Sequence, residues 1–177
     1  MNESLFGGNR NCQRCCCPPI IINCPNGCIQ EIEECEEKLE VFGGAYNCKP
    51  TVICLKGREE ERLPLPVSMP SRCICHECNA LKVLESGIYE INYMLNASAS
   101  LGGEVTLAVN HNGKEIPSSI QTHLLAVGIT STFNGSIITC LKAGDVLDLI
   151  VFSCMCLNLC LNTGTTVSLT VKRIAEE

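Results

Sequence analysis

The chain has 177 residues, which is enough for one ordinary domain with an extension or for two small domains. Aromatic residues make up only 4% of it, so Val, Ile, Leu and Thr must build the core, and this suits β-sheets better than a helical bundle. The net charge of -6, with no basic patch, argues against a nucleic-acid surface, because phosphate binding needs clustered Lys and Arg. We also expect no membrane span, since the apolar runs have only the length of a strand.

The cysteine content conflicts with the start of the chain. Sixteen cysteines suggest an oxidising environment, because disulfides persist outside the reducing cytosol. The first residues, however, lack the basic start and the apolar stretch of a signal peptide. We therefore expect either that the thiols bind metal or that the protein is made inside a cell without a signal peptide and is oxidised later.

Residues 1–29 are predicted to form a cysteine-rich N-terminal arm. Three of its cysteines are adjacent and cannot easily pair with one another, because neighbouring side chains splay apart and disulfide geometry is narrow. Their partners must come from elsewhere in the chain or from another chain. The two prolines that follow favour an extended segment that reaches outward. The cysteines of this arm are Cys12, Cys15, Cys16, Cys17, Cys24 and Cys28.

Residues 30–62 are predicted to form a short helix and a connector. Apolar residues recur at helical spacing over residues 30–42, glutamates fill the other face, and Gly43 and Gly44 end the pattern. Residues 46–55 are expected to form one short strand that carries Cys48 and Cys54. The charged residues 57–62 are expected to form a loop.

Residues 63–177 are predicted to form a sheet domain. Its proline-rich start, residues 63–70, suits an edge segment, because proline donates no ladder hydrogen bond. Apolar and polar residues then alternate over residues 89–96 and again over 104–110, the pattern of strands with one buried face. Asn112 and Gly113 end the second strand with a dipeptide typical of hairpin turns.

Four more strands are predicted downstream, and Gly135, residues 142–144 and residues 162–164 are predicted to separate them as turns. They cover residues 122–133, with a bulge at Gly128, and residues 136–141, 145–152 and 165–174. Short strands at such even spacing, with no helix between them, indicate an antiparallel all-β fold. A two-layer jelly-roll β-sandwich is the natural closure, since it limits exposed strand edges.

Several of these segments together resemble a known superfamily. Residues 83–93, 105–110, 141–149 and 167–171 are similar to strands of the jelly-roll superfamily of tumour necrosis factor and the globular complement domains. Within it, residues 63–174 look like the C-terminal domain of the BclA-type glycoproteins of bacterial spore surfaces. The chain lacks the collagen-like Gly-X-Y stalk of those proteins. In its place, the cysteine-rich arm is similar in kind to the arms of cysteine-rich exosporium proteins and endospore appendage (Ena-type) subunits.

This resemblance implies a structural role on the spore surface. Such proteins assemble from many copies, which disulfides lock together, and the superfamily habit implies trimers that associate through apolar sheet faces. The protein would be made in the mother cell cytoplasm and exposed when that cell lyses, which explains the absence of a signal peptide. The expected partner is the protein itself, in a trimer-based lattice or a fibre of the exosporium or of an appendage, with other spore-surface proteins as further partners.

Two cysteine groups of the sheet domain are candidate sites. The first, a zinc candidate made of Cys73, Cys75, His76 and Cys78, crowds all four ligands into six residues, whereas structural zinc sites usually take ligand pairs from separate turns. Disulfides are therefore the main interpretation and metal the alternative, and no cofactor is expected. The second group is expected to join the arm cysteines in disulfides between or within subunits, or alternatively to pack as small buried hydrophobes. It consists of Cys140, Cys154, Cys156 and Cys160.

Enzyme activity is not expected. A catalytic cysteine needs a histidine and a carboxylate nearby, and neither His111 nor His123 shows a nucleophile partner in the sequence. No phosphate-binding loop or hydrolase motif appears. The sequence therefore predicts a structural protein that self-assembles into a disulfide-cross-linked spore-surface layer or appendage fibre. The alternatives are a cysteine-rich zinc-binding protein and a soluble trimeric ligand-binding module.

Overall fold

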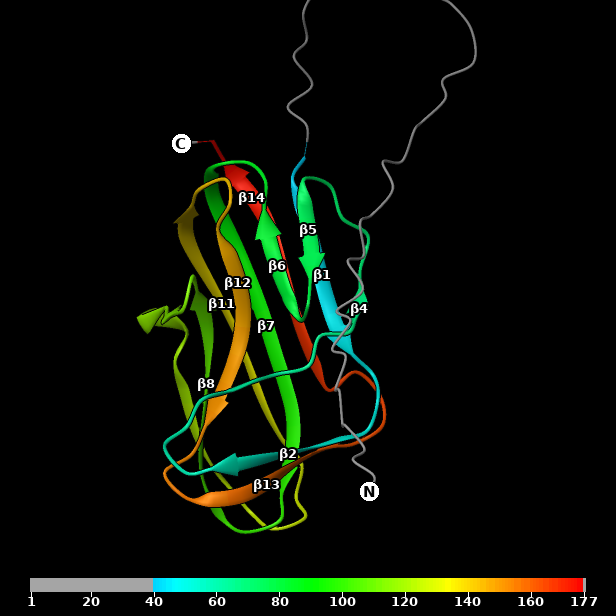
Figure 1. Ribbon diagram of the computed structural model, residues 1–177, viewed down its shortest axis with the longest axis vertical. Coiled ribbons are helices and arrows are strands. Elements are labelled where there is room, and N and C mark those ends of the chain that lie inside the picture. Colours follow the sequence, from blue (N-terminus) through cyan, green and yellow to red (C-terminus); the bar gives the residue numbers. More distant parts are fainter. Residues whose placement is uncertain (1–39, 177) are drawn as a thin grey trace, which may run out of the picture.

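The computed structural model describes residues 40–176, and β-strands dominate this part of the chain (Figure 1). One short 3-10 helix, η1 (Pro117–Ser119), interrupts them. No helix in residues 40–176 has the length and hydropathy needed to cross a membrane. The strands are β1 (Phe42–Asn47), β2 (Thr51–Lys56), β3 (Glu61–Arg62), β4 (Val67–Ser68), β5 (Ile74–Glu77), β6 (Ala80–Val83), β7 (Gly87–Ala99), β8 (Gly103–His111), β9 (Lys114–Glu115), β10 (Gln121–Leu125), β11 (Ser131–Leu141), β12 (Val146–Phe152), β13 (Cys156–Leu161) and β14 (Val167–Ala175).

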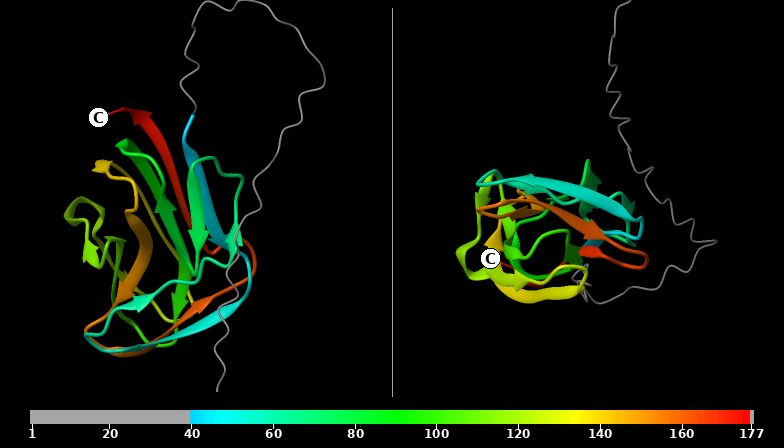
Figure 2. Two further views of the ribbon diagram at one scale, coloured as in Figure 1. Left: turned by 45° about the horizontal axis from the view of Figure 1, so that its top comes forward. Right: turned by 90° about the horizontal axis from the view of Figure 1, so that it is seen from below.

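The strands form two antiparallel sheets that face each other across one core (Figure 2). The first sheet has the order β2-β13-β7-β14-β1-β4, and β11 pairs with the other edge of β7. The second has the order β10-β8-β12-β6-β5, with the short strands β3 and β9 paired to β12 and β8. The predicted all-β, antiparallel, two-layer arrangement is confirmed.

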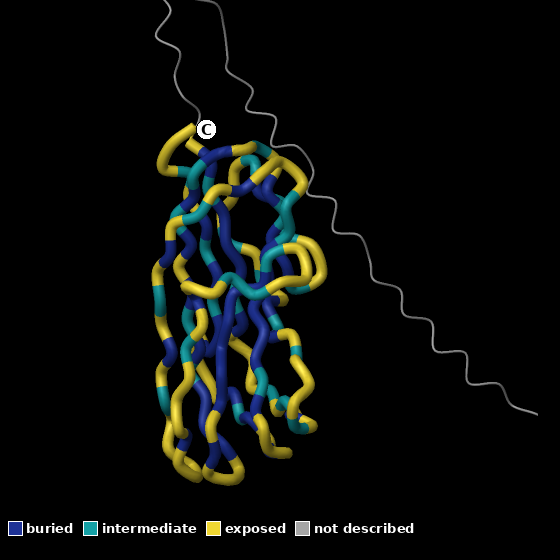
Figure 3. Tube along the Cα trace, turned by 90° about the vertical axis from the view of Figure 1, so that its left-hand side faces the viewer, coloured by how far each residue is buried: buried dark blue, intermediate teal, exposed yellow. Residues whose placement is uncertain are grey.

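Strand β7 is the longest strand and the centre of the first sheet. The predicted alternation holds along it, because Tyr89, Ile91, Tyr93 and Leu95 are all buried while Asn92 between them is exposed. Figure 3 shows that buried residues are concentrated along the strands of the sandwich and exposed residues in the loops at both ends. Burial of this continuous apolar layer stabilises the fold, at roughly 25 cal/mol for each Å² of apolar surface removed from water.

The predicted strand over residues 122–133 is wrong in one respect. The segment contains two strands, because β10 belongs to the second sheet and β11 to the first. Gly128 lies in the connection between them with a φ of 69°, which favours glycine and lets the chain turn from one sheet to the other. The residue predicted to bulge a strand therefore lies in the loop after β10, which ends at Leu125.

Gly135 was expected to separate two strands, but it lies inside β11, directly opposite Tyr93 of β7. A Cβ atom at this position would overlap the phenol ring of Tyr93. The hydroxyl group of that ring donates a hydrogen bond to the backbone oxygen of Ser119 at 2.8 Å. Gly135 is therefore required by a close approach of a side chain and not by a turn.

The predicted turn at Asn112 and Gly113 is confirmed, with φ values of 52° and 84°. It contacts the turn before β12, where Asn112 Nδ2 donates to Asp145 Oδ1 at 2.8 Å. The other carboxylate oxygen of Asp145 lies 2.8 Å from the backbone nitrogen of Lys142 and 2.8 Å from Nε2 of His111. Burial opposes ionisation of Asp145, but these hydrogen bonds outweigh it and lower the pKa of its carboxyl group.

The sheets begin earlier in the chain than the boundary predicted at Leu63. Strand β1 pairs with β14, and β2 pairs with β13, so both belong to the sandwich. Gly43 and Gly44, expected to end a helix over residues 30–42, lie within β1; most of that predicted helix falls outside the described residues. Residues 46–55 contain parts of two strands rather than one, because the chain turns after Asn47.

Asn47 holds this turn. Its side chain is buried, with Nδ2 donating to Lys49 O at 2.9 Å and to Thr166 Oγ1 at 3.1 Å. Lys49 N in turn donates to Asn47 Oδ1 at 3.1 Å. A buried amide with all of these partners fixes the path from β1 into β2.

Candidate cross-linking site

The cysteines in the described part of the chain lie near the surface. The arm cysteines Cys12–Cys28 fall outside the described residues. None of the nine cysteines in residues 40–176 is buried: Cys73, Cys75 and Cys160 are half-buried and the other six are exposed. The alternative that Cys140, Cys154, Cys156 and Cys160 pack as buried small hydrophobes is therefore wrong.

Strands β2 and β13 form a ribbon across one end of the sandwich (Figures 1 and 2). Three cysteines lie on its outer face. Along β13, the leucines are buried, whereas Cys156 is exposed and Cys160 is half-buried. Along β2, Leu55 is buried and Cys54 is exposed. Because side chains in a strand alternate between faces, these three thiols share the side that faces away from the core. We call Cys54, Cys156 and Cys160 the thiol face.

The register of the ribbon places no cysteine of the thiol face opposite another. Cys54 pairs with Asn158, Cys156 with Lys56 and Cys160 with Val52. Cys54 is therefore a diagonal neighbour of the other two cysteines, and diagonal Cα atoms lie about 7–8 Å apart. A disulfide usually needs Cα atoms no more than about 6.8 Å apart. The register of the ribbon thus keeps the cysteines of the thiol face too far apart to form disulfides with one another.

The sequence prediction missed Cys54 as a member of this site. The signal was present in the alternation of β2, where Val52, Cys54 and Lys56 are exposed and the residues between them are less so. The prediction of a single strand over residues 46–55 hid this alternation. Only the pairing of β2 with β13 brings Cys54 beside Cys156 and Cys160, which are more than one hundred residues away in sequence.

The structure separates the four cysteines predicted as one group. Cys154 is exposed in the loop between β12 and β13, next to Cys156. Cys140, by contrast, pairs with Ile88 near the start of β7, whereas Cys160 pairs with Ser98 near its end. Cys140 is therefore at the far end of the sandwich from the thiol face.

The predicted zinc ligands lie along β5 and its two ends. Cys75 and His76 are consecutive residues of β5, so they lie on opposite faces of the strand. Nε2 of His76 is 2.6 Å from the backbone oxygen of Leu65. Cys78 lies in the turn to β6. Within residues 40–176, no three His, Cys, Asp or Glu side chains are grouped so that they could hold a metal ion.

Cys73 differs from the thiol face in its electrostatic environment. Its side chain packs against the core, and its thiol is hydrogen-bonded to the Glu85 carboxylate. That hydrogen bond, followed by burial and the negative charge of Glu85, raises the pKa of the Cys73 thiol. The hydrogen bond from Cys73 lowers the pKa of the Glu85 carboxyl group. Arg173 lowers it further, because its Nη1 lies 2.7 Å from Glu85 Oε2. The Cys73 thiol is thus held in its protonated, less reactive form.

Comparison with solved structures shows that the fold is similar to that of tumour necrosis factor. Eiger TNF from S. frugiperda matches with a TM-score of 0.54 and 10% identity over 78% of this chain and 94% of that chain. Murine APRIL at pH 5.0 matches with a TM-score of 0.53 and 10% identity over 77% of this chain and 100% of that chain. At this identity the similarity concerns the jelly-roll fold alone, which confirms the predicted fold class.

Comparison with curated proteins gave no match. The family model described as the BclA C-terminal domain matches residues 45–175, which include nearly all of the strands described above. This match confirms the resemblance found in the sequence. The chain therefore belongs to the BclA C-terminal domain family.

Proposed function

We propose that this protein is a structural subunit of a bacterial spore surface, where copies assemble into an exosporium-type layer or appendage fibre and are locked together by disulfides. Membership of the BclA C-terminal domain family supports the spore surface as the location. The cysteines proposed to form the bridges are those of the arm, together with cysteines of the sandwich. The protein acts as a building block and not as an enzyme.

The exposure of the thiols is the observation that carries this proposal. A cysteine that only fills space in a core is usually buried, and no cysteine in residues 40–176 is. The thiol face, Cys154 and Cys140 are displayed on strands and loops whose backbone the sheets hold in place. Fixed, accessible thiols that cannot bridge across their own ribbon are suited to bonding with a second copy.

The bridges form by thiol–disulfide exchange with a small-molecule disulfide such as oxidised glutathione. A protein thiolate attacks that disulfide and releases one small thiolate, which leaves a mixed disulfide on the protein. A thiolate of the second copy then displaces the other small thiolate. Two protein thiols are oxidised to one disulfide, and the small disulfide is reduced to two thiols. The resulting bond makes disassembly depend on bond cleavage rather than on concentration.

Contacts between copies also need a noncovalent surface. The sequence led us to expect apolar sheet faces, but the outer face of the first sheet carries polar residues such as Asn92 and Thr170. Large apolar side chains are exposed on β10 and the loop that follows it, and singly on β2 at Val52 and on β11 at Ile138. Leu124 is 76% exposed, and Val127 and Ile129 are each 62% exposed. An apolar patch at this edge of the sandwich favours association of copies edge to edge.

Electrophoresis of the purified full chain in detergent tests the proposal. After oxidation with glutathione, boiled samples without reductant should give a ladder of covalent multimers, and reductant should convert the ladder to monomer. Protein whose thiols were alkylated before oxidation is the matched control and should stay monomeric in both lanes. Monomer in every lane of the oxidised, unalkylated protein would refute disulfide-locked assembly. Stoichiometric zinc with no covalent multimers would favour the metal-binding alternative instead.

A further inference from the structure

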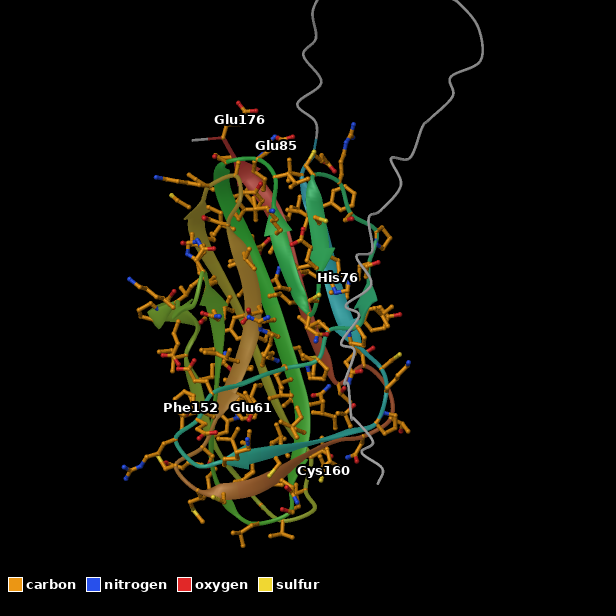
Figure 4. The ribbon with its side chains drawn as sticks, in the orientation of Figure 1. Glu61, His76, Glu85, Phe152, Cys160 and Glu176 are labelled. Atoms are coloured by element: carbon orange, nitrogen blue, oxygen red, sulfur yellow. The ribbon has the colours of Figure 1, made fainter. Side chains whose placement is uncertain are left out.

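The loop that leads from β12 into β13 carries two cysteines, Cys154 and Cys156, with a single residue between them. Both side chains are exposed. Figure 4 shows where the loop lies, because Phe152, at the end of β12, and Cys160, on β13, are at the end of the sandwich away from Glu85. Two exposed thiols this close together in the chain are a candidate redox pair.

The chain itself limits how far apart the two cysteines can be. Two residues of fully extended chain span at most about 6.6–7.2 Å between Cα atoms. A disulfide usually needs Cα atoms no more than about 6.8 Å apart. The backbone bends at Cys154 and Met155, which shortens the separation of the Cys154 and Cys156 Cα atoms below the extended limit. This pair therefore comes within the distance that the members of the thiol face exceed.

The side chains of the loop alternate in direction. A Cβ atom added at Gly57, in the turn after β2, would lie 3.5 Å from Cys156 Sγ and 3.4 Å from the backbone oxygen of Cys154. A Cβ atom added at Gly103, at the start of β8, would lie 3.6 Å from Met155 Sδ. Met155 is therefore directed toward β8, whereas Cys156 is directed toward the turn after β2. Because successive side chains point opposite ways, Cys154 shares the side of Cys156.

Ser153 fixes the start of the loop. This residue is buried, and its hydroxyl group donates a hydrogen bond to Glu104 O at 2.6 Å. The same hydroxyl oxygen accepts one from Met155 N at 3.2 Å. The backbone oxygen of Ser153 accepts a further hydrogen bond from Arg58 N at 2.7 Å. The fold thus holds the two thiols near each other before any bond forms, and such proximity favours reaction between them.

The other Cys-x-Cys motif of residues 40–176, Cys73 and Cys75, is arranged differently. The side chain of Cys73 packs against the core, and its thiol is hydrogen-bonded to the Glu85 carboxylate. Cys75 lies on β5, beyond the buried Ile74. The spacing of two cysteines is therefore not enough for a redox pair. Cys154 and Cys156 differ because both of their thiols are exposed and lie on one side of a bent loop.

We propose that Cys154 and Cys156 are a redox pair, which a low-molecular-weight disulfide converts into an intrachain disulfide. One thiolate of the pair attacks the small disulfide, forms a mixed disulfide with it and releases one small thiolate. The other thiolate of the pair then attacks the protein sulfur of the mixed disulfide, closes the ring and releases the second small thiolate. The two protein thiols lose two electrons and two protons, and the small disulfide is reduced to two thiols.

This inference rests on the proposed function, because it names two thiols that a mild oxidant withholds from bridges between copies. A disulfide between Cys154 and Cys156 closes a small, exposed ring, and exposed or strained disulfides exchange readily with other thiols. The closed pair stays out of cross-linking until another thiolate attacks it and frees one of its sulfurs. The redox state of the pair thus regulates how many thiols this end of the sandwich offers.

Peptide mapping of the full chain without reductant locates the bond. The protein is incubated with oxidised glutathione, its free thiols are alkylated with iodoacetamide, and it is cleaved with trypsin. The peptide of residues 143–172 contains Cys154, Cys156 and Cys160 and has no Lys or Arg before its last residue. Fragmentation of this peptide in the mass spectrometer should place a disulfide between Cys154 and Cys156 and leave Cys160 outside it.

Glutathione buffers distinguish ring closure from simple glutathione adducts. Closure consumes one oxidised glutathione and releases two reduced ones, so the ratio of closed to open pair depends on the square of the reduced glutathione concentration. Diluting the whole buffer tenfold, at a constant ratio of oxidised to reduced glutathione, should therefore raise the closed-to-open ratio about tenfold. Cys154→Ser and Cys156→Ser leave one thiol, whose adduct should not respond to the dilution. Cys140→Ser, at the other end of the sandwich, is the matched control and should respond as the natural chain does.

Two results would overturn the redox pair. One is glutathione adducts on Cys154 and Cys156 with no ring between them. The other is a disulfide between Cys156 and Cys160 that survives in the Cys154→Ser variant. Neither result bears on disulfide-locked assembly, which electrophoresis of the same samples measures separately. A closed pair in a chain that stays monomeric would support the redox pair and refute the proposed function.

Discussion

Replacing Gly135 with alanine tests how the sandwich is packed around β7. Gly135 lies opposite Tyr93, and an added Cβ atom would overlap the Tyr93 ring. The ring cannot move without weakening the hydrogen bond from its hydroxyl group to Ser119, which ties β7 of the first sheet to the 3-10 helix η1 that precedes β10 of the second sheet. The substitution therefore affects both packing and a buried hydrogen bond.

The expected loss follows from these two effects. Overpacking of a well-packed core costs about 1–3 kcal/mol, and loss of a buried hydrogen bond costs about 1 kcal/mol. Alanine restricts the unfolded chain more than glycine does, which returns about 0.4–1 kcal/mol. We expect Gly135→Ala to lower the free energy of unfolding by about 1–3.6 kcal/mol. For a chain of this size, that corresponds to a decrease in Tm of about 2–14 °C.

Thermal unfolding followed by circular dichroism, with reductant present so that no disulfide contributes, measures this change. Gly102→Ala is the matched control, because the nearest atom to its added Cβ would be the backbone oxygen of Leu125 at 3.6 Å, an ordinary contact distance. The control should leave Tm unchanged or raise it slightly. Equal Tm values for the two variants would show that Tyr93 does not press on Gly135, and the packing argument would be refuted.

Three further predictions concern the turn after β1, acid stability and thiol reactivity. Asn47→Ala should lower the free energy of unfolding in urea by about 1–3 kcal/mol, because it leaves buried partners unpaired; an unchanged midpoint would contradict this. The pKa of the Asp145 carboxyl group is lowered below its ordinary value of 3.8, so its contribution to stability is complete well above pH 3.8 and is lost as the pH falls below that value. Asp145→Asn should remove this part of the pH dependence of the free energy of unfolding. Parallel curves of stability against pH for the variant and the natural chain would contradict this. Cys73 should react with iodoacetamide more slowly than Cys54 at pH 8, as measured by mass spectrometry, and Glu85→Gln should speed the reaction of Cys73. Equal reaction rates of Cys73 and Cys54 in the natural chain would show that Glu85 does not protect the Cys73 thiol.

The strand pattern and the fold class could be read from local sequence. The alternation along β7 predicts which of its residues are buried, because a strand places successive side chains on opposite faces, and the Asn112–Gly113 turn is set by its own backbone preferences. The resemblance to BclA-type domains rests on the same short motifs. These features depend on neighbours in sequence, so they are visible before the chain folds.

The roles of Gly135, Gly128 and Cys54 depend on residues distant in sequence. Gly135 looks like a turn residue until Tyr93 is placed across from it, and Gly128 looks like a bulge until the strands on either side are assigned to different sheets. Cys54 joins Cys156 and Cys160 only through the pairing of β2 with β13, while Cys140 is carried to the other end of β7. Local sequence determined the buried face of β7, the turn at Asn112 and Gly113, the all-β class and the wealth of thiols. Strand pairing across the sandwich decided which thiols share a surface, because register between distant strands depends on how the whole core packs.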